Sequence, residues 1–315
     1  MKKQYVSDLK AGQLVQDIFY LANREIRDRK GGGSFLVLEL SDRTGSISGK
    51  VWDNAKTLSL QAIPGQFLKI SGSVREYSGS IEIAVSDLTI IPYDQIAKDD
   101  FIPKSQYNRE ELFAELKEYL IQITNPFLSK LVNRFLEDKE FVEQFKLAPG
   151  AARVHHAYLG GLLEHTVFML RLSKTMAKVY PKIDYPLLVT GIILHDVGKV
   201  KEYVYDKVID HTLEGRLLGH IVQGYEMVST QIDEIKGFPA ELRRVLLHMI
   251  LTHHGHLEFG SPKTPKFVEA FLLHMLDYID ARAMMFQEAT EKNKGVKWTE
   301  YHQFLETNVY IKDQE

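Results

Sequence analysis

Two kinds of hydrophobic periodicity divide the chain into two parts. From about Leu14 to Ile91, apolar and polar residues alternate between turn signals, which is typical of half-buried antiparallel strands. From about Asn108 to Gln287, apolar residues recur at the spacing of one helix face. The pattern therefore predicts a multidomain α and β protein, with a β domain first and an all-α domain second.

The first part holds five predicted strands: Leu14–Arg27, Ser34–Leu40, Ser46–Trp52, Phe67–Glu76 and Ser80–Ile90. Glycine-containing reversals separate them at residues 31–33, 42–45 and 78–79. A short helical or irregular piece, residues 54–63, comes between the third and fourth strands. Five strands with a break at this place are the plan of the OB-fold, a β-barrel that commonly binds oligonucleotides across its second and third strands.

The second part follows a polar stretch, residues 94–106, which predicts a linker. Asn108 with Glu111, and Asn125 before Pro126, are helix-start signals. Longer helices are predicted at Tyr158–Val179, Tyr185–Val197, Arg216–Ile235, Pro239–Thr252 and Pro265–Met285. We therefore expect an OB-fold domain over residues 1–95, a linker with connecting helices over 96–150, and a helical domain over 151–315.

Composition limits the setting in which the chain works. Its 44% hydrophobic and 26% charged residues are ordinary for a soluble globular protein. The absence of cysteine excludes disulfides and thiolate metal sites and favours a reducing compartment. No signal-peptide pattern and no apolar run of roughly 18 residues is present, so we expect a cytoplasmic protein without a membrane partner. The net charge of −3 means that any nucleic-acid affinity must be local.

Histidines and aspartates in the predicted helices are the main sign of chemistry. His165 ends a Gly-Gly-Leu-Leu-Glu-His segment, and His195-Asp196 ends an apolar helix. Such a pair is costly to bury unless something neutralises and orders it, and a metal ion would do both. Asp277 lies in a helix that is apolar nearly all round, so its carboxylate must be paired or act as a ligand.

These residues resemble the HD superfamily of metal-dependent phosphohydrolases, whose helical domain carries a histidine, then a His-Asp pair, then a distal aspartate. The resemblance implies that one metal is held by His165, His195, Asp196 and Asp277, with Asp196 placed to bridge. The added ligands of two-metal members would be His220, His253 and His254. Imidazole and carboxylate ligands suit Mn²⁺, Fe²⁺ or another first-row ion, and two ions would clamp a phosphodiester and activate water.

Several other residues are weaker candidates. Lys199 lies four residues after His195, so a continuing helix would return it to the same face as a phosphate or leaving-group contact; with Asp196 it forms the predicted catalytic pair. His155 and His156 are expected to line the pocket. His274 fits either a core residue or a support for the ligands. Of the two distal aspartates, the resemblance favours Asp277 over Asp280 as the metal ligand, because Asp277 precedes a Tyr-Ile-Asp-Ala segment.

The barrel supplies candidates for binding a single strand. Stacking residues would be Phe35, Trp52, Phe67 and Tyr77, and phosphate contacts would include Lys50 and Arg75. Aromatic residues in a small barrel are more often core than binding surface, so we expect only some of these to contact a strand.

An N-terminal OB domain joined to an HD domain with the segment from His155 to Thr166 resembles the YhaM family of 3′-to-5′ exoribonucleases, over nearly the whole chain. The resemblance implies Mn²⁺-dependent release of nucleotides from the 3′ end of single-stranded RNA, with single-stranded DNA also cleaved. Two alternatives remain open: a phosphohydrolase of small or cyclic nucleotides with a regulatory barrel, and a binding module with a structural metal site. Oligomerisation also remains open.

Overall fold

The computed structural model describes residues 2–29, 32–53, 55–77, 80–152, 156–293 and 295–312. The predicted turns at Gly31 and at Ser78-Gly79, and the predicted pocket residue His155, lie outside these ranges. The chain forms two compact units. The first is Met1–Pro103 with Asp206–Val208, and the second is Lys104–Tyr205 with Ile209–Glu315.

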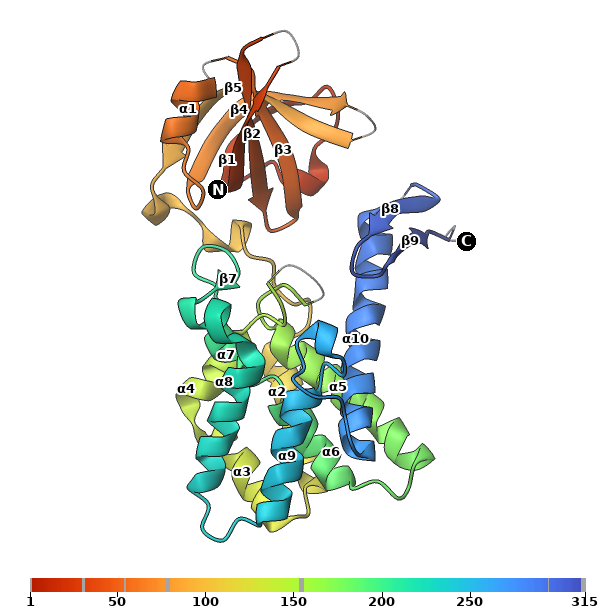
Figure 1. Cartoon of the computed structure of the whole chain (residues 1–315). Coiled ribbons are helices and arrows are strands. Elements are labelled where there is room, and N and C mark those ends of the chain that lie inside the picture. The colour runs from red at the N-terminus through yellow and green to blue at the C-terminus, as the bar shows by residue number, and fades with distance from the viewer. Residues whose placement is uncertain are drawn as a thin grey trace. The chain divides into compact units, whose positions relative to one another are not determined.

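The first unit is a closed β-barrel, as expected for the OB plan (Figure 1). Its strands are β1 (Leu14–Asp28), β2 (Ser34–Asp42), β3 (Gly45–Val51), β4 (Phe67–Tyr77) and β5 (Ser80–Ile91), in the order β1-β2-β3-β5-β4. Neighbouring strands run antiparallel except β3 and β5, which run parallel. Helix α1 (Ala55–Gln61) lies between β3 and β4 in the chain. Short 3₁₀ turns are η1 (Val6–Asp8), η2 (Tyr93–Gln95) and η3 (Lys98–Asp100).

The barrel core follows from the alternation of β2. Leu36, Leu38 and Leu40 are fully buried inside, while Phe35 and Glu39 point the other way. This period of two leaves the outer face of β2 available for polar and aromatic side chains.

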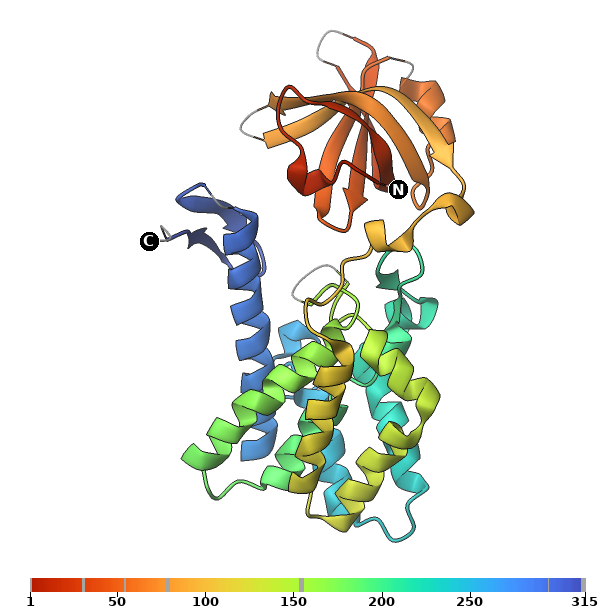
Figure 2. The same ribbon diagram turned by 180° about the vertical axis from the view of Figure 1, so that it is seen from behind.

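The second unit is a helical bundle (Figure 2). Its helices are α2 (Arg109–Glu118), α3 (Pro126–Glu137), α4 (Lys139–Leu147), α5 (Gly161–Val179), α6 (Tyr185–Leu194), α7 (Lys199–Glu202), α8 (Leu213–Asp233), α9 (Ala240–Thr252) and α10 (Val268–Lys292), with the 3₁₀ turns η4 (Tyr119–Gln122) and η5 (Leu257–Phe259). Asn108 and Asn125 accept hydrogen bonds from first-turn amides of α2 and α3, which confirms both predicted caps. Among the described residues no helix combines the length and the apolar character needed to cross a bilayer.

The second unit is not purely helical, because it also contains two short β-hairpins. One pairs β6 (Tyr203–Val204) with β7 (Asp210–His211), and the other pairs β8 (Trp298–His302) with β9 (Thr307–Tyr310). The second packs on the end of α10 through a small cluster of its own: Met285, Ala289, Leu305, Val309 and Ile311. Each segment is too short or too polar for periodicity to separate it from a loop.

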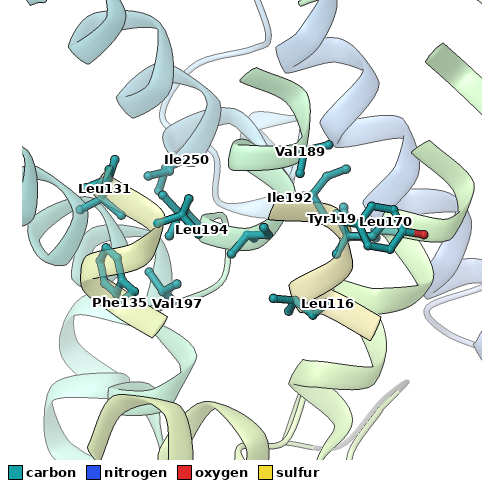
Figure 3. Close-up of a cluster of buried hydrophobic side chains, with 14 of the residues drawn as sticks. Leu116, Tyr119, Leu131, Phe135, Leu170, Val189, Ile192, Leu194, Val197 and Ile250 are labelled. Atoms are coloured by element: carbon teal, nitrogen blue, oxygen red, sulfur yellow. The ribbon is translucent and has the colours of Figure 1, made fainter. Parts of the chain in front are cut away.

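Helix α6 is the central helix of the bundle. Every residue from Leu187 to Leu194 is buried, and Figure 3 shows Val189, Ile192 and Leu194 among side chains of neighbouring helices. A helix that is apolar all round can be stable only when other helices surround it. Its last turn therefore delivers the residues that follow, beginning with His195, into the interior of the unit.

Candidate metal centre and nucleic-acid interface

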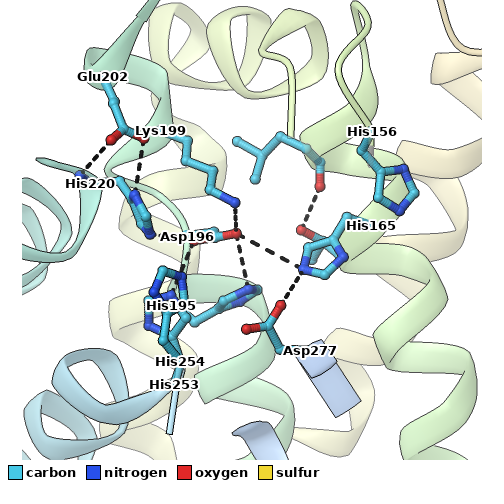
Figure 4. A network of polar contacts seen from close by, with 12 residues as sticks. His156, His165, His195, Asp196, Lys199, Glu202, His220, His253, His254 and Asp277 are labelled. Carbon is cyan, nitrogen blue, oxygen red and sulfur yellow. Dashed lines mark hydrogen bonds and ion pairs between the residues drawn. The ribbon is translucent and has the colours of Figure 1, made fainter. Parts of the chain in front are cut away.

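Five separate segments of the described chain bring imidazole and carboxylate groups to one place (Figure 4). The contributions are His165 from α5, His195 and Asp196 from the turn after α6, His220 from α8, His253 and His254 from the end of α9, and Asp277 from α10. All of the residues predicted from the sequence as metal ligands are thus brought together.

The ligand atoms fall into two groups with Asp196 between them. His165, His195 and Asp277 offer atoms within 4.8 Å of one another, and so do the three histidines 220, 253 and 254. Oδ2 of Asp196 lies 3.2 Å from Nε2 of His195, whereas its Oδ1 lies 3.4 Å from Nε2 of His253. One carboxylate oxygen faces each group, which is the arrangement that a bridging ligand requires.

Hydrogen bonds at the far nitrogen fix how the imidazoles point. Nδ1 of His195 lies 2.8 Å from the carbonyl of Ile192, and Nδ1 of His253 lies 2.7 Å from that of Ile250. A carbonyl can only accept, so Nδ1 carries the proton and Nε2 presents its lone pair to the centre. This is how metal-binding histidines are oriented in proteins.

Carboxylates orient two more histidines. Nδ1 of His165 lies 2.6 Å from Oδ2 of Asp280, and Nδ1 of His220 lies 3.0 Å from Oε2 of Glu202. Both carboxylates are buried. Asp280 therefore supports His165, and the preference for Asp277 as the metal ligand stays a prediction.

Unsatisfied atoms show that the residues fit a cation. Among the described residues, five buried atoms of the centre have no hydrogen-bond partner: Nε2 of His165, His195, His220 and His253, and Oδ1 of Asp196. Each such atom costs about 1–3 kcal/mol when it is left unpaired. Four imidazole nitrogens and a carboxylate oxygen that converge in this way suit a divalent cation, and these groups could hold one or more metal ions.

Electrostatics agree with this assignment. Burial alone would lower the pKa of His165, but the carboxylates of Asp277 and Asp280 outweigh burial and raise it to about 10. Burial would raise the pKa of Asp196, but His195 and Lys199 hold that pKa well below its usual range. The centre is thus strongly attractive to positive charge, and a bound cation would replace the proton on His165.

Lys199 reaches the centre by a different route from the one expected. Helix α6 ends at Leu194, three residues before the predicted end at Val197, so no continuing helix carries Lys199. A turn through Gly198 instead brings Nζ of Lys199 to 2.6 Å from Oδ2 of Asp196. The turn packs so closely on α8 that a Cβ on Gly198 would lie 2.1 Å from the carbonyl oxygen of His220. Burial would lower the pKa of Lys199, but Asp196 outweighs burial and raises it, so the ammonium stays charged.

The expectation for His156 needs correction. The side chain is fully buried and does not line an open pocket. Its Nε2 lies 2.8 Å from Oδ2 of Asp280, and its Nδ1 lies 2.8 Å from the hydroxyl of Tyr158. Its backbone has a φ of +57°, a costly conformation for a residue other than glycine. His156 thus holds Asp280, which in turn holds His165.

Two further residues support the ligands. Glu202 was not identified from the sequence, and the role of His274 was left open. Glu202 lies in a short charged stretch that resembles a solvated surface, and only the fold shows that it is buried against His220. His274 is buried, and its Nδ1 lies 3.0 Å from the carbonyl oxygen of His253. A Cβ on Gly255 would lie 2.3 Å from the His274 ring, so this turn must be glycine for the histidine pair to fit. His274 is therefore a support for the ligands.

Four of the candidate strand-binding residues of the barrel form two pairs. The Phe35 and Trp52 rings stack with centroids 4.7 Å apart, and Nζ of Lys50 lies 4.6 Å from the centroid of the Tyr77 ring. Arg75 is exposed on β4. Phe67 is only 2% exposed, so its interpretation as a stacking residue is wrong.

Two family models match separate parts of the chain, one in the barrel and one in the helical unit. Residues 24–91 match the model of an OB-fold nucleic acid binding domain, and residues 162–282 match that of the HD domain. Among solved structures, the second OB-fold domain of replication protein A from Methanococcus maripaludis is 25% identical, with a TM-score of 0.24 and coverage of 28% of this chain and 93% of that one.

Two curated relatives match almost end to end. The 3′-5′ exoribonuclease YhaM of Oceanobacillus iheyensis is 35% identical over 298 residues, which cover 94% of this chain and 93% of that protein. The 3′-5′ exoribonuclease YhaM of Geobacillus sp. (strain WCH70) is 34% identical over 89% of this chain and 86% of that protein. The two-domain architecture, the two family matches and this identity lead to one conclusion: the chain belongs to the YhaM family.

Proposed function

We propose that this protein is a metal-dependent 3′-5′ exoribonuclease that hydrolyses phosphodiester bonds of single-stranded RNA, and also of single-stranded DNA. The observation that carries the proposal is the position of Asp196 between two groups of ligand atoms, in which four imidazole nitrogens have no hydrogen-bond partner among the described residues. Substrate and direction come from the activity named for the relatives. The cysteine-free composition supports the cytoplasm as its compartment.

The metal ligands would divide between two ions. His165, His195 and Asp277 would hold one, the histidines at 220, 253 and 254 would hold the other, and Asp196 would serve both. When bound, two divalent ions supply positive charge against the phosphodiester oxygens and make water easier to deprotonate. We propose Mn²⁺ because the resemblance to the YhaM family implies it. A ligand set of imidazoles and carboxylates suits Mn²⁺, and Fe²⁺ or another first-row ion would fit the same donors.

The chain's own residues would then provide position and charge. Lys199 is a buried cation beside Asp196, placed to neutralise a phosphate or a leaving oxygen at the centre. The carbonyls and carboxylates behind the imidazoles keep each Nε2 aimed inward throughout turnover. In the barrel, the rings of Phe35, Trp52 and Tyr77 would stack on bases, and Lys50, which also forms an ion pair with Glu82, would contact phosphates.

Product analysis tests the proposal. RNA labelled at its 5′ end, incubated with the metal-stripped protein and then with added Mn²⁺, should shorten progressively from the 3′ end only after the metal is added. The same RNA labelled at its 3′ end should release labelled mononucleotide at once. Shortening without metal, or internal cuts that leave the 3′ label on long fragments, would contradict the proposal.

A further inference from the structure

A row of aromatic rings borders the metal centre on the side of α9 and α10. The His256 ring lies 5.4 Å from that of Phe259 and 5.5 Å from that of His274, and the His274 ring lies 6.1 Å from that of Tyr278. His274 is buried, whereas Phe259 is 49% and Tyr278 37% exposed. The row therefore has an inner ring that supports the fold and outer rings that face solvent.

Both ends of the row lie on segments that also carry or contact residues of the metal centre. The carbonyl oxygen of Phe259 lies 2.7 Å from Nδ1 of His254, a predicted ligand. Tyr278 directly follows Asp277, another predicted ligand, on α10. The side chain of Asp277 is 15% exposed, while those of His195 and Asp196 are 0% and 3% exposed. Asp277 thus lies nearer the surface than these two, on the segment that carries Tyr278.

The row continues along α10 with a cation and another aromatic ring. The guanidinium carbon of Arg282 lies 5.0 Å from the centroid of the Tyr278 ring. Its Nη1 donates to the carbonyl oxygen of Phe304, and a guanidinium has four further N–H groups that can donate to a phosphate. Phe286, one turn further, is 42% exposed. Spacing of four residues keeps these three side chains on one helix face. From Tyr278 to Phe286 the helix rises about 12 Å, room for about three stacked bases.

We propose that four side chains bind the last nucleotides of a single-stranded nucleic acid as its end enters the metal centre. They are Tyr278, Arg282 and Phe286 on α10 and Phe259 on η5, and together they are called the α10 stripe. The rings stack on bases and Arg282 contacts a phosphate. The proposal rests on the proposed function, which places the terminal linkage at the metals. Alternating exposed rings and a cation beside a hydrolytic centre match the chemistry of a single strand, because every base offers a π face and every linkage an anion.

Kinetics with two substrates test the stripe. The test uses two variants of the full chain, Tyr278→Leu and Phe259→Leu. In each, the KM for a short RNA should rise about tenfold more than the KM for a small chromogenic phosphodiester. Tyr180→Leu, which removes an exposed ring at the end of α5, serves as the matched control and should change neither value. Arg282→Gln should lower the slope of log KM against log salt by about one, and Arg282→Lys should restore it.

The outcomes separate the stripe from the proposed function. If both leucine variants kept the wild-type KM for RNA, or lost the small diester and RNA equally, the stripe would be wrong while the exoribonuclease proposal stood. A wild-type protein that hydrolyses the small diester but does not shorten RNA would overturn the proposed function itself, and the stripe with it.

Discussion

At the scale of single residues, the metal centre is characterised by the different surroundings of the two nitrogens in each imidazole ring. One nitrogen of His165, His195, His220 and His253 is held by a carbonyl or a carboxylate, and the other points inward with no hydrogen-bond partner in the part of the chain that the structure describes. A structural core histidine would satisfy both nitrogens. The converging unpaired atoms therefore favour a metal centre over a polar core.

Removing a supporting carboxylate should weaken one ion more than the other. Asp280→Asn acts on His165, and Glu202→Gln acts on His220, so each should lower the affinity of its own ion by about 10–100-fold. Competition with a chelator during metal titration measures both affinities. Asp210→Asn, at a half-exposed carboxylate of the same unit, is the control and should leave both affinities unchanged. Equal loss of both ions in each variant would contradict this division.

Substitution of Lys199 should separate catalysis from metal binding. Lys199→Gln removes the cation beside Asp196, so hydrolysis should fall by about 10²-fold, as for other groups that stabilise developing charge. The same change removes a competitor of the metals for Asp196, so the metals should bind at least as tightly. Turnover and metal titration on one preparation measure both effects. Loss of metal with Lys199→Gln would show that the lysine supports the centre and does not act on the substrate.

At the scale of elements, the centre depends on the junction between the α6–α7 turn and α8. This turn carries His195 and Asp196, and α8 carries His220. The two backbones approach at Gly198, where a side chain has no room. The relative position of the two ligand groups is thus set by backbone packing.

Two glycines at this junction should respond differently to alanine. A Cβ on Gly198 would meet backbone atoms at 2.1 and 2.6 Å, so Gly198→Ala should destabilise the fold by about 1–3 kcal/mol and weaken metal binding. A Cβ on Gly224 would have its nearest neighbour at 3.4 Å, so Gly224→Ala should be tolerated. Denaturant unfolding with and without metal measures both. An equal loss of stability in the two variants would contradict the role of the junction.

The elements also show where sequence reasoning succeeds and where it ends. Strict alternation in β2 and helix caps at Asn108 and Asn125 are local signals, and the structure confirms them. The end of α6 was misplaced, because His195 to Gly198 leave the helix to meet α8, a contact distant in sequence. The role of Glu202 was missed for the same reason: its burial depends on tertiary packing and not on its neighbours in the chain.

At the scale of the whole molecule, two units of different architecture share the proposed task. The described residues of the barrel contribute nothing to the metal centre, and the helical unit carries all of its predicted ligands. The order of β domain and helical domain was predictable, because the two periodicities differ along the chain. The division after Pro103 depends on tertiary contacts, which a polar linker does not specify.

Changes in the barrel should act on polymer binding. Trp52→Ala removes one ring of the Phe35–Trp52 pair, so KM for a long RNA should rise about tenfold relative to KM for a small phosphodiester. Leu60→Ala, at an exposed residue of α1, is the control and should leave RNA hydrolysis unchanged. Equal changes on both substrates with Trp52→Ala would show that the barrel does not act through the strand.

The most direct measurement is the number of Mn²⁺ ions bound per chain, determined by elemental analysis after stripping, reloading and removal of free metal. We expect two ions in the wild-type protein. Since Asp196 faces both ligand groups, Asp196→Asn should retain fewer than two and lose RNA hydrolysis, while remaining folded. A wild-type protein that binds no metal, or an Asp196→Asn variant that binds two ions and degrades RNA at the wild-type rate, would contradict the shared centre.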